Sequence, residues 1–208
     1  MEIRRIRVIS PLKHVSEARP TPALRILAIS DMEIKDSPAL HRIDAELSCG
    51  NYHLVVSCGD VHAGIIEHIA TTVPVIGVRG NHDSPQLPAG MRDLHCRMIT
   101  YNGVKFGGFQ GAWKYKPTGH FLYENDEVER YLSRFPGLDV FVAHNPMSGI
   151  HDVNDGVHNG FEAFRNYCMR TQPGLFLHGH SGIQGETALG STIVMGINGV
   201  KGIEIELV

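Results

Sequence analysis

Apolar residues occur along the first half of the chain in short runs that predict buried strands. Three such runs are LRILAIS at 24–30, HLVVSC at 53–58 and VPVIGV at 73–78. Each is bounded by polar or turn-forming residues. Their length and continuous apolar character are typical of strands covered on both faces.

The segments between these strands carry helix signals. Residues 37–50 begin with Ser37 as N-cap and Pro38 at the first helical position, and they end at Gly50. Their apolar positions recur on one helical face: Leu40, Ile43 and Leu47. A second helix is predicted at 62–71. Strand, helix, strand, helix, strand in this order indicates right-handed βαβ units and a parallel sheet.

The second half of the chain has a different pattern, with turns that favour antiparallel strands. Asn102-Gly103 lies between two β-rich runs, which is a strong hairpin signal. Turns at Gly190-Ser191 and Asn198-Gly199 predict an antiparallel end of the chain. Further strands are expected at 139–143 and 174–178, with a helix near 160–170 between them.

One more helix is predicted before the strand at 139–143. Its apolar face is made by Val128, Tyr131, Leu132 and Phe135, and Pro136-Gly137 closes it. No repeat, low-complexity tract or break in composition divides the chain. We therefore expect residues 1–208 to form a single α/β domain, with a mixed, doubled sheet and helices outside.

The N-terminal segment stands apart from this domain. A β-like stretch from Ile3 to Ile9 is followed by a segment at 10–23 that prolines interrupt. Residues 1–23 are therefore predicted to be an extension or an extra strand, which pairs within the sheet or with a neighbouring molecule. The oligomeric state stays open.

Composition narrows the class of protein. No apolar run approaches the roughly 20 residues of a membrane span, and nothing resembles a signal peptide. The net charge of −3 is interspersed without a basic run, so an extended nucleic-acid surface is not expected. The four cysteines form no CxxC pair, which favours a reducing, cytoplasmic location. The 13 scattered histidines hint at metal or phosphate chemistry.

Polar residues follow five of the predicted strands at their carboxyl ends. They are Asp31 with Glu33, Asp60, Asn81-His82-Asp83, His144-Asn145, and His178 with His180. In open α/β sheets ligands bind at this edge, because the loops converge there. Taken singly, each has an ordinary reading: an aspartate after a strand is often a helix cap, Asn-His-Asp is a common turn, and a histidine at a strand end is often half-buried.

Together on one edge, these groups would face like-charge repulsion and a desolvation cost unless a cation lies among them. Mixed oxygen and nitrogen ligands suit a borderline divalent ion. The ordered series Asp-x-Glu, Gly-Asp, Gly-Asn-His-Asp, His-x-Pro and Gly-His-x-Gly over about 24–207 resembles the calcineurin-like metallophosphoesterases. The resemblance implies a four-layer αββα sandwich of two mixed β-sheets flanked by helices.

The resemblance also implies roles for individual residues. Asp60 is similar to the carboxylate that bridges two metal ions, and Asp31 to a ligand of the first ion. Asn81, His144 and His180 resemble the remaining ligands of the second ion. His82 resembles the imidazole that contacts the phosphoryl group and protonates the leaving oxygen, and Asp83 resembles the residue that orients this imidazole. Together with Asp60 they form the expected catalytic group.

This chain departs from the family pattern twice, and both departures affect the first metal. Glu33 stands where the family's DxH has histidine, and Gly182 where its GHxH has the last histidine. Glu33 can coordinate a metal ion. A carboxylate in place of an imidazole makes the donor set harder and more anionic, which favours Mn²⁺ or Mg²⁺ over Zn²⁺, and Fe is a further candidate. Gly182 cannot coordinate. Water, His62 or His178 would fill that position, although His178 is otherwise expected near the site or in the core.

The expected activity is metal-dependent hydrolysis, by metal-bound hydroxide, of a small phosphorylated substrate such as a nucleotide, as a phosphodiesterase or phosphomonoesterase. The alternative is a weakly active or inactive member that binds one metal ion and a phosphate or nucleotide. A third alternative is a scaffold that retained only the fold. Such a protein would lose metal ligands indiscriminately, whereas the expected second-metal ligands and the Gly-Asn-His-Asp motif are complete here. For the substrate we expect contacts with Asn81, His82 and His158, the last lying in a loop at 151–161 that is rich in turn-forming residues. The segment at 111–123 is a second candidate to line the substrate pocket.

Overall fold

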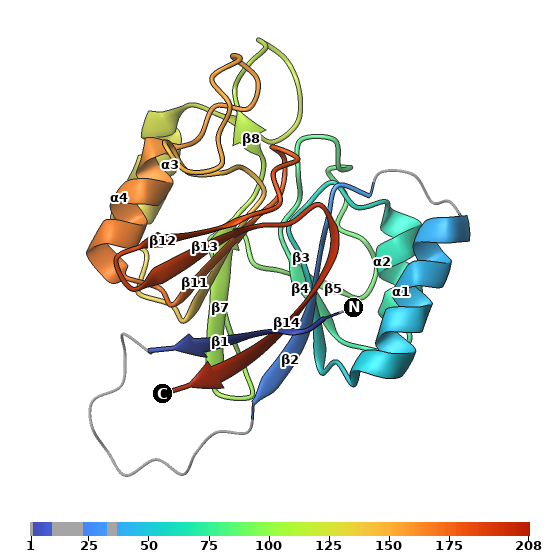
Figure 1. Ribbon diagram of the computed structural model, residues 1–208. Coiled ribbons are helices and arrows are strands. Elements are labelled where there is room, and N and C mark those ends of the chain that lie inside the picture. The colour runs from blue at the N-terminus through green and yellow to red at the C-terminus, as the bar shows by residue number, and fades with distance from the viewer. Residues whose placement is uncertain (1, 10–22, 33–36) are drawn as a thin grey trace.

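The computed structural model describes residues 2–9, 23–32 and 37–208 as four layers, with two β-sheets face to face and helices on both outer sides (Figure 1). The helices are α1 (Ser37–Gly50) and α2 (Ala63–Ile69) on one side, and α3 (Asn125–Leu132) and α4 (Glu162–Thr171) on the other. The expected αββα architecture is confirmed.

The first sheet has the strand order β1-β14-β2-β3-β4-β5. Its strands are β1 (Arg4–Val8), β14 (Gly199–Leu207), β2 (Leu24–Ser30), β3 (Leu54–Ser57), β4 (Val75–Gly77) and β5 (Met91–Asp93). The strands from β2 to β5 are parallel, as the alternation of strands and helices predicts. Their carboxyl ends therefore lie at one edge.

The second sheet has the order β12-β13-β11-β10-β7-β6. Its strands are β12 (Glu186–Leu189), β13 (Thr192–Gly196), β11 (Leu175–His178), β10 (Val140–Ala143), β7 (Val104–Phe109) and β6 (Met98–Tyr101). The central strands β13, β11, β10 and β7 are parallel. A small pair, β8 (Ala112–Trp113) with β9 (Leu122–Tyr123), extends beyond this sheet.

Three apolar layers hold the four structural layers together. Leu54 and Val56 point between the sheets, whereas Val55 on the same strand packs toward α1 and α2. The layer under α3 and α4 is aromatic, and Phe141 stacks on Phe176 with ring centroids 5.3 Å apart. Alternate residues of the inner strands thus serve different layers, which explains their continuous apolar character.

Most of the predicted elements are present, and two details are wrong. Asn198-Gly199 does not close a hairpin, because β13 pairs with β11 in one sheet whereas β14 crosses to the other and pairs with β2. Tyr131 does not face the core; it is 54% exposed, while Val128 and Leu132 on the same helix are buried. The hairpin at Asn102-Gly103 is confirmed, with both residues at positive φ.

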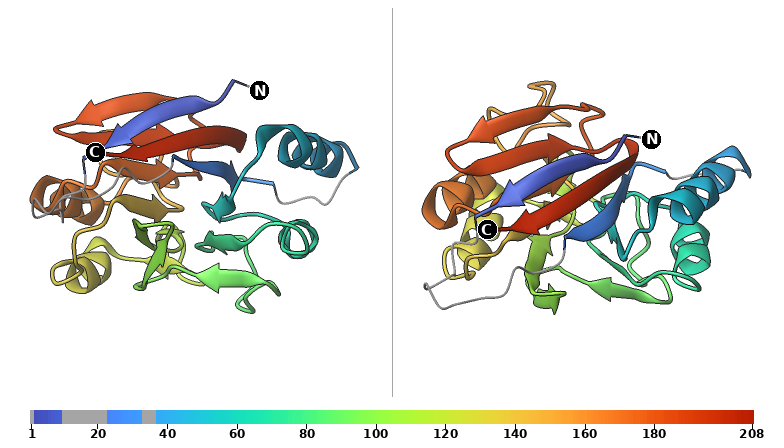
Figure 2. Two further views of the ribbon diagram at one scale, coloured as in Figure 1. Left: turned by 90° about the horizontal axis from the view of Figure 1, so that it is seen from below. Right: turned by 60° about the horizontal axis from the view of Figure 1, so that its bottom comes forward.

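The N-terminal strand joins the sheet of its own chain, since β1 pairs in parallel with β14. Both views of Figure 2 show the two strands side by side, with the C-terminus at one end of the pair. Residues 10–22 of the proline-interrupted segment lie outside the described residues. That residues 1–208 form one domain stays a prediction.

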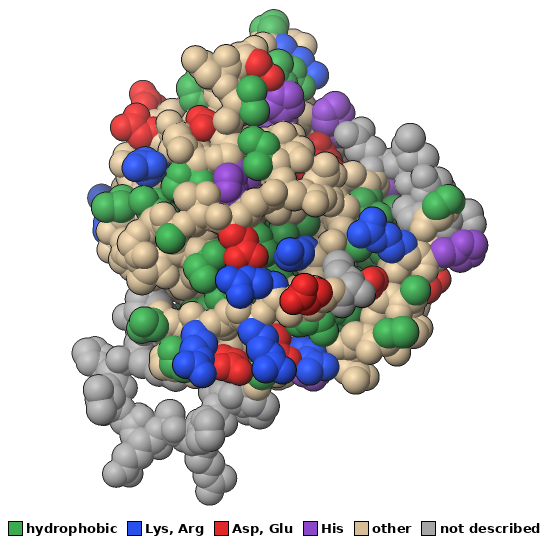
Figure 3. Space-filling view, in the orientation of Figure 1, with side chains coloured by type: hydrophobic (Ala, Val, Ile, Leu, Met, Phe, Trp, Pro, Cys, Tyr) green, Lys and Arg blue, Asp and Glu red, His purple; other side chains and the backbone are tan. Residues whose placement is uncertain are grey.

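Glu204 of β14 links three strands through its carboxylate. It is 5% exposed and accepts hydrogen bonds from Arg25 Nε at 2.6 Å and Arg5 Nε at 2.8 Å. The face in Figure 3 shows basic and acidic side chains alternating here rather than gathering by sign. The bond from Arg25, with the attraction of both guanidinium groups, lowers the pKa of Glu204.

We predict that Glu204→Gln lowers the melting temperature at pH 7 by about 2–4 °C, as expected for a loss near 1 kcal/mol in a chain of this size. Because the folded-state pKa is below the unfolded value, the contribution is present above pH 4.5 and is lost as the pH falls through the folded pKa. Melting curves from pH 3 to 7 should therefore converge at the acid end. Glu206→Gln, whose carboxylate is 38% exposed, is the control and should change little.

Candidate metal centre

The carboxyl ends of the parallel strands bring the predicted site residues to one edge shared by both sheets. Asp31 follows β2, Asp60 follows β3, and Asn81 follows β4 in the first sheet. His144 follows β10 and His180 follows β11 in the second. The site is therefore assembled from two sheets, each of which contributes its own side chains.

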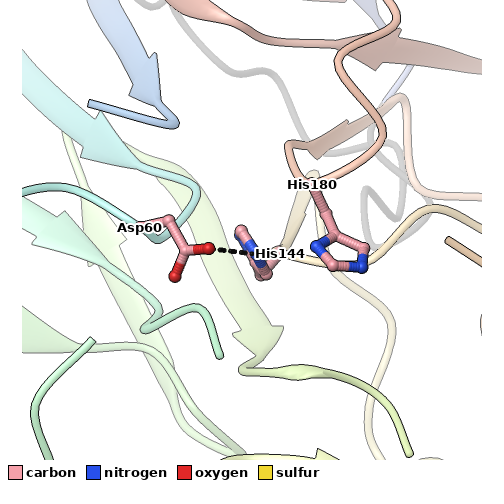
Figure 4. A group of neighbouring side chains, drawn as sticks. All are labelled: Asp60, His144 and His180. Atoms are coloured by element: carbon pink, nitrogen blue, oxygen red, sulfur yellow. Dashed lines mark ion pairs between the residues drawn. The ribbon is translucent and has the colours of Figure 1, made fainter. Parts of the chain in front are cut away.

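Three of these residues form a compact group. Asp60, His144 and His180 each offer a ligand atom, and these atoms lie within 4.8 Å of one another. In Figure 4 the Asp60 carboxylate points at His144, and His180 lies on the far side of His144. Asp60 Oδ2 is 3.1 Å from His144 Nε2, and the two imidazole centroids are 4.9 Å apart. Two nitrogens and a carboxylate at this spacing suit a divalent ion.

Hydrogen bonds fix the orientation of His144. Its Nδ1–H donates to the carbonyl oxygen of Cys58 at 2.9 Å, so Nε2 is directed at Asp60 and at Asn81 Oδ1, 3.2 Å away. A backbone carbonyl behind the imidazole is a common way to orient a metal-binding histidine. Asn81 thus adds an oxygen beside the group, and the four residues expected to hold the second metal ion lie together.

The buried carboxylate of Asp60 creates a local demand for positive charge. Burial by itself lowers the pKa of His144, but the attraction of Asp60 outweighs it and raises the pKa to about 9. Burial conversely raises the pKa of Asp60, and the nearby His144 brings it below its ordinary value. Such a position holds a cation, either a proton or a metal ion, so the residues fit a divalent metal.

His180 meets the requirement that a metal-binding imidazole be neutral. Burial lowers its pKa to about 3. Its Nε2 lies 3.4 Å from the carbonyl oxygen of Val157, and in the tautomer that donates there Nδ1 keeps its lone pair. Its backbone N–H donates to both carboxylate oxygens of Asp31, at 3.2 and 3.3 Å.

The backbone of the site lies in an uncommon conformation. Asp31, Asp60 and His180 all have positive φ, at 56°, 52° and 66°. Residues with a Cβ rarely adopt this region, and such positions cost about 1 kcal/mol or more each. Strained residues gather at functional sites, where they aim side chains that regular strands would turn elsewhere.

The glycines before Asp60 and Asn81 allow their loops to touch. A Cβ on Gly59 would lie 2.5 Å from the backbone nitrogen of Gly80, and one on Gly80 would overlap the Asp60 carboxylate. The Gly-Asp and Gly-Asn sequences therefore have a steric reason in this fold.

Asp83 connects the same two loops through its carboxylate. Its Oδ2 accepts hydrogen bonds from the backbone N–H of Gly80 at 2.7 Å and of Asp60 at 2.9 Å. Burial raises its pKa, and these two N–H groups oppose that change. Asp83 thus positions Asp60 directly, which adds to the role of orienting His82 that the sequence suggests.

His82 lies at the mouth of a pocket beside this group. Its backbone N–H donates to Asp60 Oδ1 at 2.9 Å. Its exposed side chain lines a pocket of about 270 Å³ together with His62 and Ser84. Asp83 lines the same pocket, whereas the three residues of the compact group do not, so the pocket adjoins the group through His82 and Asp83.

The first-metal residues are only partly brought together. Asp31 is near the group through His180, and burial raises the pKa of its carboxyl group. Glu33 lies outside the described residues. Gly182 has a φ of +69°, and a Cβ there would lie 3.9 Å from Asn198 Nδ2. His62 accepts from Gly64 N–H as the cap of α2, and this bond uses its Nδ1.

His178 does not join the metal group. It is fully buried, with Nδ1 bonded to the carbonyl of Gly179 and Nε2 3.0 Å from His151 Nδ1. This placement fits the expectation that it lies in the core or the site's surroundings, and gives no support to the alternative that it replaces the missing ligand. His158 reaches the site's rim, where its ring centroid is 4.9 Å from that of His180 and Asp155 binds its Nδ1.

Two residues not assigned a role from the sequence organise the rim. Asn145 is buried, accepts from the backbone N–H of Trp113 and donates to the carbonyl of Asn159, so it ties together the two loops expected to line the substrate pocket. Tyr115 O–H accepts a hydrogen bond from Asn81 Nδ2 at 3.4 Å. The position of Asn145 next to His144 is the one signal that the sequence offers for it.

The match to a family model agrees with this geometry. Residues 24–184 match the model of the calcineurin-like phosphoesterases. This chain belongs to that family. Members are metallophosphoesterases that bind divalent metal ions, and the group of Asp60, His144 and His180 is a possible metal site in this member.

Solved structures share the fold at low sequence identity. The structure of TT1561 of Thermus thermophilus aligns over 85% of this chain and 89% of its own, with 17% identity and a TM-score of 0.63. GAP50, the anchor in the inner membrane complex of Plasmodium, aligns over 85% of this chain and 71% of its own, with 9% identity and a TM-score of 0.52. No curated protein matches the chain.

We predict that Tyr115→Phe weakens Mn²⁺ binding at the second-metal residues by several-fold, because the Asn81 carboxamide loses the partner that keeps Oδ1 toward His144. Calorimetric titration of metal-free protein with Mn²⁺ measures the change. Tyr131→Phe removes an exposed hydroxyl elsewhere and is the control. Equal affinities in all three proteins would contradict the role given to Tyr115.

Proposed function

We propose that this protein is a metal-dependent phosphoesterase that hydrolyses a small phosphorylated substrate, as a phosphodiesterase or phosphomonoesterase. The observation that carries the proposal is the group of Asp60, His144 and His180 with Asn81 Oδ1 beside it. A pocket lined by His82 and Asp83 adjoins this donor set, since the His82 N–H donates to Asp60 and Asp83 accepts from the Asp60 N–H. Family membership gives the reaction class, phosphoester hydrolysis.

In this proposal Asp60, Asn81, His144 and His180 hold the second divalent ion, and Asp31, Glu33 and Asp60 contribute to the first. A bound ion supplies Lewis acidity, which polarises the phosphoryl oxygens and makes water acidic enough to serve as a nucleophile near neutral pH. The oxygen-rich first set favours Mn²⁺, with Mg²⁺, Fe and Zn²⁺ as the other ions to test.

The chain's own residues orient the substrate and move the proton. His82 is anchored by its backbone to Asp60, so its exposed imidazole stays within reach of a phosphoryl group bound there. It donates a proton to the departing oxygen. Because water is the nucleophile, the reaction needs no serine or cysteine and no covalent intermediate. Asp83 holds the Asp60 and Gly80 loops together, and the His158 ring lies 4.9 Å from that of His180.

The surroundings favour a small substrate. Lys114 pairs with Glu124 at 3.5 Å, and Lys116 lies over the Tyr115 ring, so both cations already have a partner within the chain and do not form a surface for a long anionic ligand.

Within the described residues, no helix has the length and apolar character to cross a membrane. All four cysteines are unpaired, which supports the proposed cytoplasmic location.

A second candidate function follows from Gly182. Because this position contributes no side chain, the protein would hold one ion and bind a phosphate or nucleotide with little or no turnover. The compact second-metal group supports this alternative as well as it supports hydrolysis. Turnover and metal content together separate the two.

We predict that Asp60→Asn lowers turnover of bis-p-nitrophenyl phosphate in Mn²⁺ by at least about a hundredfold, since the variant removes the charge on which the metal group depends. Asp44→Asn, which alters a surface carboxylate paired with His68, should retain full activity. Wild-type protein with one tightly held ion and no turnover in any divalent metal would support the binding protein instead.

Removal of metal is expected to destabilise the fold. An ion present at 100 times its dissociation constant stabilises the folded state by about 2.7 kcal/mol, which corresponds to roughly 5–10 °C in a chain of this size. Melting with Mn²⁺ and after exhaustive chelation measures the difference. An unchanged melting temperature, with no Mn²⁺ in crystals grown in its presence, would contradict a metal centre.

A further inference from the structure

Gly182 leaves a ligand position without a side chain, and a side chain from the crossover between β13 and β14 lies in the adjoining space. A Cβ built on Gly182 would meet one non-neighbouring atom of the described residues within 4 Å, which is Nδ2 of Asn198 at 3.9 Å. A side chain at position 182 would therefore extend into the space beside the Asn198 carboxamide.

The topology places Asn198 at the site edge. It lies in the crossover from β13 to β14, where Ile197 N–H donates to the carbonyl of His178 at 2.7 Å. The next residue, Gly199, pairs with Ser30 in the ladder between β14 and β2. Asn198 therefore sits between the loop that carries His180 and the end of the strand that precedes Asp31.

The backbone of Asn198 is fixed while one end of its side chain stays available. Its carbonyl oxygen accepts from Gln184 Nε2 at 2.6 Å, and its own Nδ2 donates to the carbonyl of Gly182 at 3.4 Å. In the part of the chain that the structure describes, its Oδ1 accepts no hydrogen bond. The side chain is exposed, so an ion can reach it.

The carboxylate of Asp31 lies beside this crossover. Gly199 pairs with Ser30, the residue before Asp31, and a Cβ on Gly179 would lie 2.8 Å from Asp31 Oδ2. A carboxamide oxygen is a hard, neutral donor, which suits Mn²⁺ or Mg²⁺ beside two carboxylates.

We propose that Asn198 is a ligand of the first metal ion, its carboxamide oxygen taking the place of the side chain that Gly182 lacks. This inference rests on the proposed function, since it assumes that metal binds at the strand ends. It distinguishes this chain from a one-metal protein, because Asp31 and Asn198 then both contribute ligands to the first site.

The test is Mn²⁺ stoichiometry and affinity, read from the EPR signal of free Mn²⁺ during titration and from elemental analysis. Wild-type protein should bind two ions per chain. Asn198→Ala should keep one tight ion and weaken the other by about tenfold or more. Asn198→Asp should keep both, because it retains an oxygen ligand although it loses the N–H that donates to Gly182.

The aspartate variant separates ligation from a structural role. If the hydrogen bond to Gly182 were the only function of Asn198, the alanine and aspartate variants would lose the ion equally, and the proposal would be overturned. Gln184→Ala removes the bond to the Asn198 backbone but no ligand, and it should leave both ions bound. Metal-free melting curves check that each variant folds.

A rescue variant gives an independent reading. Asn198→Ala combined with Gly182→His restores an imidazole at the open position and should recover binding of two ions per chain, with a weaker affinity for the first-site ion because the new side chain stands at positive φ. A single ion in the wild-type protein, or an Asn198→Ala variant that still binds two, would overturn the role of Asn198 alone. Wild-type protein that binds no ion would overturn the proposed function too.

Discussion

The site depends on a buried carboxylate that faces a buried imidazole across two sheets. Asp60 is 2% exposed and His144 is fully buried, yet their charged atoms lie 3.1 Å apart. Removing a carboxylate from water costs several kcal/mol unless a cation compensates it, and Cys58 and Asn81 leave His144 Nε2 directed at the carboxylate. A metal ion between the sheets would satisfy the same demand with more ligands, so the interaction that joins the two halves of the sandwich also defines the metal centre.

The loops around this pair are shaped to keep the ligands converged. Positive φ values at Asp31, Asp60 and His180 aim three polar side chains into the gap, and Gly59 and Gly80 let their loops pack without side chains between them. Asp83 then ties those loops together through two backbone N–H groups. The strain of these conformations is offset by the rigid sheets beneath, where apolar layers fix the strands.

In our proposal the first-metal position has changed its ligands while the fold persists. The imidazole expected at Gly182 is absent, but the crossover to β14 places the Asn198 carboxamide beside the vacated space. A change from nitrogen to oxygen donors shifts metal preference toward harder ions and leaves the second-metal residues unaltered. In our proposal the protein therefore retains phosphoester chemistry with an altered first site.

The sequence by itself determined the order of strands and helices, the hairpin at Asn102-Gly103 and the polar groups that end each strand. These features are local: apolar runs, turn-forming pairs and caps act within a few residues. The polar groups at the strand ends could be expected at one edge, because parallel strands bring their carboxyl ends together, and the family resemblance supplied their expected roles as metal ligands. Only the tertiary structure decided that β14 crosses to the other sheet, that Tyr131 faces solvent, and that Tyr115, Asn145 and Asn198 border the site. Each of these depends on which distant strand or loop packs alongside, and such packing leaves no periodic signal in the chain.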